Sequence, residues 1–212
     1  SINTSLLSGV PVVVPSNEDQ EDIAGVLSVF DEKIRLLQEQ NKTLEEMAQV
    51  LFKHWFVDFE FLNNEGKPYK SSGGKMVESE LGEVPAGWTV GVIGDFVEIK
   101  GGSTPSTKEL SFWNGDIHWT SPKDLSNNKG DIFLFDTEKK VTEEGLKQIS
   151  SGLLPEGTLL MSSRAPVGYL AISQVPISIN QGYIAFKPGG YLDNYFMYLR
   201  LKKNMRAIKN VS

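Results

Sequence analysis

The sequence contains no cysteine and only two histidines among its 212 residues. The lack of cysteine excludes a disulfide framework, a cysteine-based zinc site and a thiol nucleophile, and it fits a reducing compartment. No run of about 18 apolar residues is present, so no helix is expected to span a membrane. No basic segment precedes an apolar stretch near the start, which argues against a secretory signal. These absences predict a cytoplasmic protein with no membrane association.

Motifs that mark common catalytic and cofactor sites are also missing. The sequence has no G-x-x-x-x-G-K-[ST] phosphate loop, no G-x-G-x-x-G after a strand pattern and no G-x-S-x-G. His54 and His118 would have to converge with carboxylates to hold a metal ion, which their positions do not indicate. The carboxylate–lysine string Asp136 to Lys139 is interpreted as a solvated turn. We therefore expect no enzyme activity, no cofactor and no metal site.

The net charge of -6 is unevenly distributed along the chain. Residues 1–16 carry no charged side chain, and residues 17–60 carry eleven acidic and four basic ones. Residues 61–212 hold sixteen acidic and seventeen basic side chains, and five basic ones lie between Arg200 and Lys209. The acidic total would argue against nucleic acid, but it belongs to one segment and leaves the remainder free to bind phosphate.

Residues 17–60 have the pattern of one long helix. No proline occurs between Asn17 and Pro68, and Gly25 is the only glycine before Gly66. Apolar residues alternate at spacings of four and three over more than four heptads, which is typical of a coiled-coil seam. The seam positions are Ile23, Leu27, Phe30, Ile34, Leu37, Asn41, Leu44, Ala48, Leu51 and Trp55. Two readings stay open: the helix packs on its own domain, or it pairs with a partner helix whose register Asn41 helps to set.

The rest of the chain is rich in strand and turn patterns. Proline-bounded Val10–Val14 predicts a short buried strand, residues 61–76 are polar and predict a linker, and residues 77–212 predict a strand-rich domain. A helical pattern carrying the basic cluster closes the domain. Expected strands are Val90–Ile93, Phe96–Ile99, Ile132–Phe135, Thr158–Met161, Tyr169–Ile172 and Tyr183–Phe186. The fold class is α+β, with residues 1–16, 17–60, 61–76 and 77–212 as the successive parts.

Three loops and one short turn concentrate groups suited to nucleic acid. The loops are Gly101–Lys108, Trp113–Leu125 and Ser162–Gly168, and the turn is Asn180–Gly182. Hydroxyls and lysines suit phosphate oxygens, while arginine and amides suit base edges. The alternatives are a plain surface turn for the first loop, core anchors for the tryptophans, a structural ion pair for the arginine and hydrogen bonds to turn backbone for the two amides. The candidate DNA-binding residues are Ser103, Thr104, Ser106, Lys108, Trp119, Lys123, Ser163, Arg164, Asn180 and Gln181.

Several ordered strings resemble the specificity subunits of type I restriction–modification systems. The resemblance covers nearly the whole chain, and each string is weak alone but specific in its order. The strings include Val10–Pro15 with Gln20, Thr43–Phe59, Ser79–Trp88, Gly101–Ser106, Trp119–Leu125, Thr142–Leu146, Ser163–Gly168 and Asn180–Gly182.

This resemblance implies a non-catalytic subunit in which two target-recognition domains, joined by two antiparallel helices, read the halves of a bipartite site in double-stranded DNA. It implies that the helices dock DNA methyltransferase (modification) subunits, which carry S-adenosylmethionine, and that an ATP-dependent restriction subunit joins the complex. This chain holds one nearly complete recognition domain and one helix, so a fragment or half of a longer subunit is expected.

The long helix also predicts an assembly. About 40 residues at 1.5 Å each make a rod of roughly 60 Å. Residues 60–76, fully extended, span about 60 Å at most and leave no slack for returning to Val10–Val14. We therefore expect an antiparallel homodimer in which Val10–Val14 of each chain completes the recognition domain of the other. The alternative function is an assembly scaffold that acts through the helix and does not bind DNA.

Overall fold

The computed structural model describes residues 3–128, 130–164 and 166–210. The chain divides into two compact units, Ser1–Ala48 and Gln49–Ser212. In the described ranges, no helix has the length and apolar character needed to cross a membrane. The helices are α1 (Thr4–Ser8), α2 (Asn17–Phe56), α3 (Ile93–Phe96), α4 (Pro122–Asn127), α5 (Glu143–Leu146), α6 (Asn194–Lys209) and the 3₁₀ turn η1 (Leu110–Phe112). The strands are β1 (Met76–Val77), β2 (Val84–Pro85), β3 (Ile99–Gly101), β4 (Trp113–Thr120), β5 (Phe133–Leu134), β6 (Lys139–Val141), β7 (Leu159–Ser162), β8 (Leu170–Ser173), β9 (Ile177–Ile179) and β10 (Tyr183–Phe186).

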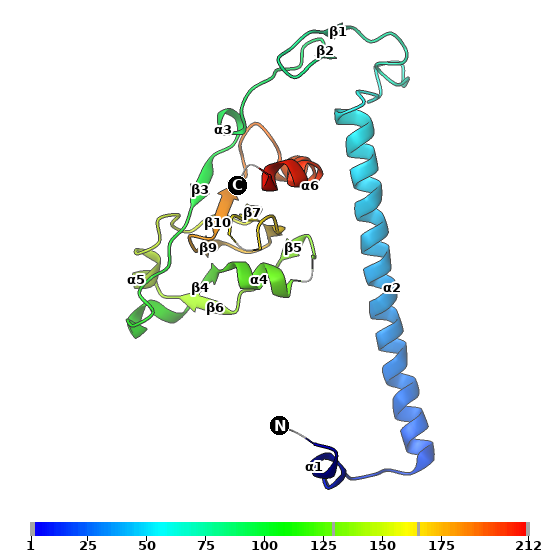
Figure 1. Ribbon diagram of the computed structural model, residues 1–212, viewed down its shortest axis with the longest axis vertical. Helices are drawn as coiled ribbons and strands as arrows, with labels where there is room; N and C mark the ends of the chain where they lie inside the picture. The colour runs from blue at the N-terminus through cyan, green and yellow to red at the C-terminus, as the bar shows by residue number, and fades with distance from the viewer. Residues whose placement is uncertain (1–2, 129, 165, 211–212) are drawn as a thin grey trace. The chain divides into compact units, whose positions relative to one another are not determined.

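The predicted long helix is α2, a single uninterrupted helix of 40 residues (Figure 1). Its start is capped because the Asp19 amide donates to the Ser16 hydroxyl at 3.1 Å, while that hydroxyl donates to the Asp19 carboxylate at 2.6 Å. Acidic side chains lie in the first turn and Lys53 in the last, where each favours the helix dipole. The helix ends at Phe56 rather than residue 60, and Phe59 adopts a left-handed backbone with φ 61°.

The heptad seam of α2 is exposed within one chain. Ile34 and Leu44, for example, are 54% and 62% exposed. The other apolar seam residues are also exposed except Ala48, which is half-buried. The apolar positions of the seam are therefore largely open to solvent in the described structure.

Residues before α2 differ from the expected buried strand. The chain forms the short helix α1, which Asn3 caps by accepting a hydrogen bond from the Leu6 amide at 2.9 Å. Val10–Val14 belongs to no strand and its side chains are exposed, with Val13 at 100%. Val10–Val14 therefore forms no strand within the single chain, and the expected strand in the recognition domain of a partner stays a prediction.

The segment expected to be a linker, residues 61–76, is folded. Phe61 stacks on Tyr69 at a centroid distance of 4.7 Å and on Trp88 at 5.3 Å. Phe52, the buried residue of α2, contacts Phe196 of α6 at 5.2 Å. Aromatic side chains thus join the last turns of α2 and the following segment to the strand-rich domain, a packing that the polar composition of residues 63–75 did not indicate.

The described residues form three sheets: the short antiparallel pair β1-β2 and two larger sheets that build the core of the strand-rich domain. Of these two, the larger has the order β3-β10-β7-β8-β5, and the smaller has the order β6-β4-β9. Along β7, Leu160 faces one hydrophobic cluster while Leu159 and Met161 face another, as expected for side chains that alternate across a strand. The larger sheet is therefore covered on both faces, which explains the continuous apolar sequence of β7.

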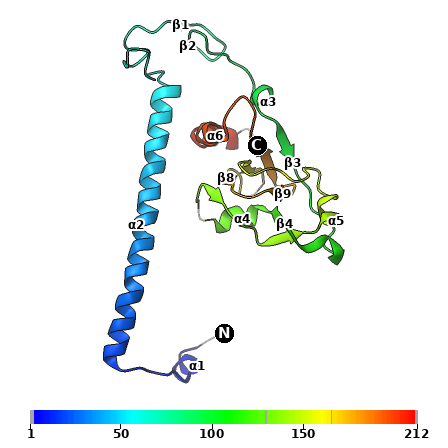
Figure 2. The same ribbon diagram turned by 180° about the vertical axis from the view of Figure 1, so that it is seen from behind.

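Three hydrophobic clusters fill the layers. The first lies between the larger sheet and β9 and includes Leu160, Ile177 and Ile179. The second lies between the larger sheet and α6, where Met197 and Leu201 are buried; Figure 2 shows α6 beside the strands. The third packs α5 against the smaller sheet. The predicted C-terminal helix is confirmed, and this layered arrangement confirms the α+β fold class.

The structure confirms some of the expected strands and not others. Strands lie within or overlap the predicted ranges at β5, β7, β8 and β10. Of Phe96–Ile99 only Ile99 is in a strand, and Val90–Ile93 contains no strand because α3 begins at Ile93. The predicted loop Trp113–Leu125 is instead β4 followed by α4, so that interpretation is wrong. Alternation in β4 was hidden by the polar residues that its exposed positions carry.

Candidate nucleic-acid interface

Loops from four parts of the sequence leave the same edge of the two sheets. The ends of β4 and β9 lie side by side because these strands are parallel, with Thr120 opposite Ile179. The start of β10 lies opposite the ends of β3 and β7, since Ile184 pairs with Gly101 and Tyr183 with Ser162. The described segments that follow these strand ends form one loop edge: residues 102–108, 121–124, 163–164, 166–168 and 180–182.

Hydrogen bonds from the Ser103 amide and from two hydroxyls fix the position of the loop after β3. The Ser103 amide donates to the Ile179 carbonyl at 3.1 Å, and the Ser103 hydroxyl donates to the Gln148 carbonyl at 2.9 Å. The Thr104 hydroxyl donates to Gln181 Oε1 at 2.6 Å. A Cβ at Gly102 would lie 1.9 Å from the Ile179 carbonyl oxygen, so only glycine allows this approach. Ser103 and Thr104 therefore hold the loop in position, while Ser106 and Lys108 are exposed.

Trp119 is a buried residue that holds the first loop of the edge in place. It is 5% exposed, it packs edge-on against Trp113 at 5.1 Å, and its indole Nε1 donates to the Ser103 carbonyl at 3.3 Å. The core reading of this tryptophan is therefore the one the structure supports, and base stacking by it is not available. Nearby, the buried Tyr183 hydroxyl donates to the Ser121 carbonyl at 2.6 Å, and burial raises the pKa of Tyr183.

Lys123 stands at the first turn of α4, with Asp124 buried behind it. The Asp124 carboxylate accepts the Ser121 amide at 2.8 Å and the Glu138 amide at 2.8 Å, which fixes α4 to the segment that leads into β6. The Lys123 ammonium pairs with the Glu138 carboxylate at 2.7 Å. Hydrogen bonding with Glu138 raises the pKa of Lys123 and lowers that of Glu138. A phosphate would compete with this exposed carboxylate for the lysine.

The loop after β7 presents Arg164 to solvent. Ser162 is buried and its hydroxyl donates to the Pro166 carbonyl at 2.7 Å, while the Ser163 amide donates to the Gly182 carbonyl at 2.8 Å. Arg164 is exposed and has no carboxylate partner in the described part of the chain. The ion-pair reading of Arg164 is thus not supported within these residues. Ala165, part of the same predicted loop, lies outside the described residues.

The basic end of α6 adjoins this loop. A Cβ at Gly168 would lie 2.4 Å from the Met205 sulfur and 2.7 Å from a Lys209 side-chain carbon. Arg206 and Lys209 are exposed in the last turn of α6. The cationic helix end and the arginine loop therefore belong to one region of the domain.

Two amides lie in the turn between β9 and β10. Asn180 Oδ1 accepts the Gly182 amide at 2.8 Å, and Gln181 Oε1 accepts the Thr104 hydroxyl. In residues 3–128, 130–164 and 166–210, neither amide NH₂ group has a hydrogen-bond acceptor. Each side chain is therefore oriented by its oxygen and leaves donors for a ligand.

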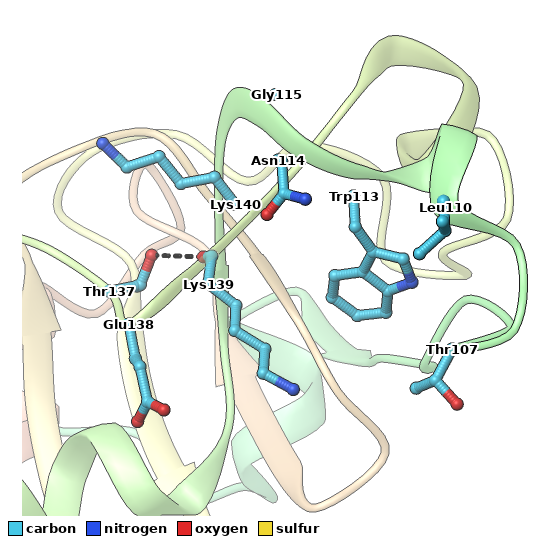
Figure 3. A pocket seen from close by; sticks show the side chains of 9 residues that line it. All are labelled: Thr107, Leu110, Trp113, Asn114, Gly115, Thr137, Glu138, Lys139 and Lys140. Carbon is cyan, nitrogen blue, oxygen red and sulfur yellow. Dashed lines mark hydrogen bonds between the residues drawn. The ribbon is translucent and has the colours of Figure 1, made fainter.

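A groove of about 440 Å³ lies beside the loop edge (Figure 3). Trp113 forms one wall, and the Lys139 ammonium stands 5.5 Å from the centre of its indole ring. Asn114 lines the groove from a left-handed backbone with φ 62°. Sequence reasoning missed this feature, because it interpreted the string ending at Lys139 as a solvated turn. The apposed tryptophan lies 26 residues earlier in the chain, and no local pattern connects the two.

The described residues bring no set of three histidine or carboxylate side chains together for a metal ion. His118 on β4 lies 3.2 Å from an Asp136 carboxylate oxygen and 3.3 Å from the Thr137 hydroxyl. Burial and, to a lesser extent, Lys140 lower the pKa of His118, against an opposing influence of Asp136. This arrangement is that of a half-buried histidine on a strand beside a single carboxylate.

Comparison with known families decides what kind of domain this is. Residues 85–212 match the family described as the type I restriction modification DNA specificity domain, and this match covers more than half of the chain. The chain belongs to this family. The resemblance found in the sequence is therefore confirmed, and specificity subunits of type I systems are non-catalytic.

Relatives of this specificity domain come from bacteria and archaea. The chain is 42% identical over 137 residues to the type I restriction enzyme MjaIX specificity subunit of Methanocaldococcus jannaschii, covering 64% of this chain and 32% of that protein. It is 25% identical over 245 residues to the HindI specificity subunit of Haemophilus influenzae, covering 93% and 53%. The chain thus spans about a third to a half of these relatives.

A solved structure shares the fold of the specificity domain and its helix. The type I restriction–modification S subunit from M. genitalium aligns with a TM-score of 0.53 and 20% identity, covering 92% of this chain and 44% of that one. At this level of identity the likeness concerns the fold alone.

Proposed function

We propose that this specificity domain reads one half of a bipartite site in double-stranded DNA through its loop edge. The observation that carries the proposal is the convergence of the four loops at one edge of two sheets. Backbone pairing holds them there, so the side chains at the edge are presented from a rigid support. Family membership supports the same conclusion from an independent direction.

The candidate residues take different roles in this proposal. Lys108, Lys123 and Arg164 supply positive charge for phosphate, and Arg164 is also suited to bidentate contact with guanine. Asn180 and Gln181 offer amide donors to base edges. Ser103, Thr104 and Trp119 act beneath them by fixing the loops, whereas Ser106 and Ser163 are polar groups of the edge itself.

Replacing Arg164 by alanine tests the proposal directly. We expect DNA affinity to fall about 10- to 100-fold, which corresponds to the loss of one bidentate contact. The matched control is Lys67→Ala, because Lys67 is exposed, its ion pair among the described residues is with Glu65, and it belongs to none of the four loops of the edge. Equal DNA affinity of the Arg164 variant and the unaltered protein would contradict the assignment.

Selection from a random DNA library, with the modification subunit present, would identify the target. We expect an enriched sequence and a binding constant that falls steeply as salt rises, because bound phosphates displace counterions. Affinity that is insensitive to salt, or enrichment of no sequence, would contradict DNA reading by this domain.

We further propose that α2 pairs with an antiparallel copy of itself and docks modification subunits, and that a restriction subunit joins through the assembled complex. The exposed heptad seam supports this part, because an isolated helix gains most of its stability from packing an apolar face. Two identical domains would then read a symmetric bipartite site. Sedimentation that shows a monomer at all concentrations would rule out the homodimer.

The second candidate is an assembly scaffold that does not bind DNA. The observation in its favour is again the seam of α2, where Ile23, Leu27, Phe30, Ile34, Leu37 and Leu44 are all exposed. Under this alternative, Arg164→Ala leaves every measured association unchanged, whereas Leu37→Asp in the seam abolishes partner binding.

A further inference from the structure

Two segments have the sequence pattern of strands and yet form none in this chain. They are Val10–Val14, which precedes α2, and the stretch around Val90 that leads into α3. Every other predicted strand at least overlaps a strand of the structure. Both segments are mainly apolar, uncharged and largely exposed. A single cause, the absence of the strand with which each would pair, explains why neither forms a strand in this chain.

The first of these segments leaves its backbone without partners. The Val10 amide donates to the Leu7 carbonyl at 3.3 Å, and Pro11 has no amide hydrogen. Val12, Val13 and Val14 make no backbone hydrogen bond with any described residue. Their side chains are 74%, 100% and 67% exposed, an arrangement that costs free energy in water and favours pairing.

The second segment, residues 88–92, is held at both ends and open in the middle. Trp88 is anchored by stacking on Phe61, and its amide donates to the Pro85 carbonyl at 3.0 Å. Val92 is extended, with φ −91° and ψ 152°, and its amide donates to the Asp95 carboxylate at 3.3 Å. Between them, residues 89–91 make no backbone hydrogen bond within the described ranges. Fixed ends and unpaired amides are the features of a strand edge prepared for a partner.

We propose that Val10–Val14 of one chain pairs as a β-strand with residues 88–92 of a second copy of the chain. The inference rests on the homodimer proposed above and names the contact that closes it. Both segments have five residues, or about 17 Å of strand, and neither carries a charge that would oppose pairing. Pairing gives partners to the backbone groups of both and covers Val12, Val13 and Val92.

The edge of β5 is the competing acceptor. Phe135 is 66% exposed beside it, and Phe133 contacts Tyr195 at a centroid distance of 6.3 Å. However, β5 already forms a strand and pairs with β8, whereas residues 88–92 form none. The missing strand therefore points to residues 88–92.

The chain contains no cysteine, so single introduced cysteines report proximity without interference. A Val12→Cys chain and a Val90→Cys chain are mixed, incubated until subunits have exchanged between dimers, and then oxidised. A second mixture uses Val13→Cys with Val90→Cys. Because neighbouring side chains of a strand face opposite sides, we expect one mixture to give a disulfide-linked dimer and the other to give about tenfold less.

Controls separate the alternatives. Each variant oxidised alone is expected to stay unlinked, and linkage of Val12→Cys or Val13→Cys to Phe135→Cys would overturn the proposal in favour of β5. A chain carrying both Val12→Cys and Val90→Cys distinguishes pairing within one chain, since an internal disulfide at monomer mass would also overturn it.

Failure of this inference is distinguishable from failure of the proposed function. If sedimentation shows a dimer and no disulfide forms with Val90→Cys, the strand pairing is wrong and the homodimer stands. If the unaltered protein is a monomer, the homodimer itself is wrong. Val13→Pro provides a second measurement: it removes one amide donor outside the domain core and is expected to weaken dimerisation about tenfold without changing domain unfolding.

Discussion

The strand-rich domain and the long helix bury their apolar residues in opposite ways. In the domain, Leu159 and Leu160 on one strand are both fully buried, because α6 covers one face of the sheet and β9 the other. In α2, Ile23 through Leu44 repeat with equal regularity and remain exposed. The domain therefore gains its stability from apolar packing within the chain, whereas the apolar seam of the helix gains none from the described residues around it.

The largest effect is expected from a cavity in the domain core. Leu160→Ala removes a fully buried side chain and should lower the free energy of unfolding by about 2–5 kcal/mol. Leu27→Ala, on the exposed seam, should leave domain unfolding unchanged and affect only association. Urea unfolding measures both variants. Comparable destabilisation of the domain by the two substitutions would remove the contrast between the regions.

Gly102→Ala is expected to have the next largest effect. Its Cβ would lie 1.9 Å from the Ile179 carbonyl oxygen, so the loop after β3 must move away from the turn at Asn180. We expect a loss of about 1–3 kcal/mol in stability together with weaker DNA binding. Gly101→Ala is the matched control, because its Cβ meets nothing within 4 Å. Unfolding and DNA titration of both variants measure the difference.

Asn41→Leu tests whether the seam of α2 is the surface through which the helix pairs. Replacing the one polar seam residue should strengthen helix pairing by on the order of 1–2 kcal/mol and relax its register. Lys42→Leu, one residue off the seam, should do neither. Analytical ultracentrifugation gives the association constants. A tighter dimer from the control alone would move the interface to another face of α2.

The smallest expected effect is a pH dependence within the domain. Burial keeps the pKa of His118 below its ordinary value, despite the nearby Asp136. The unfolded chain therefore takes up a proton first, so the stabilising contribution is present above the unfolded pKa of about 6.5 and is lost as pH falls toward the lower folded value. His118→Asn should reduce the change of the urea unfolding midpoint between pH 7.5 and pH 5.5. An unchanged slope would assign the dependence to other groups.

Much of this architecture could be predicted from the sequence, for physical reasons that differ by element. The period of α2 is local and strong, and apolar runs such as Leu159–Met161 identify strands without tertiary information. Most of β4 could not be recognised, because its exposed positions carry asparagine and aspartate and its half-buried positions include glycine and histidine. The folding of residues 61–76 depends on Trp88, which lies outside that segment.

The candidate site shows the same division. Polar loops were recognisable by composition, and their order along the chain indicated a family. Composition did not show which hydroxyls are free to face a ligand. Ser103 and Thr104 donate hydrogen bonds to Gln148 and Gln181, which are far away in sequence. The groove between Trp113 and Lys139 likewise depends on the pairing of β4 with β6.

The pairing of β3 with β10 has a consequence for how the domain folds. Gly101 lies opposite Ile184, so the strand that pairs with β3 comes from a part of the chain about 80 residues later. Contacts between residues so distant in sequence form slowly, because a long loop must close before they contribute. During translation α2 forms early, and the loop edge is assembled only once β10 has emerged. Slow refolding that depends on the C-terminal strands, with rapid recovery of helix, is the kinetic behaviour that this topology predicts.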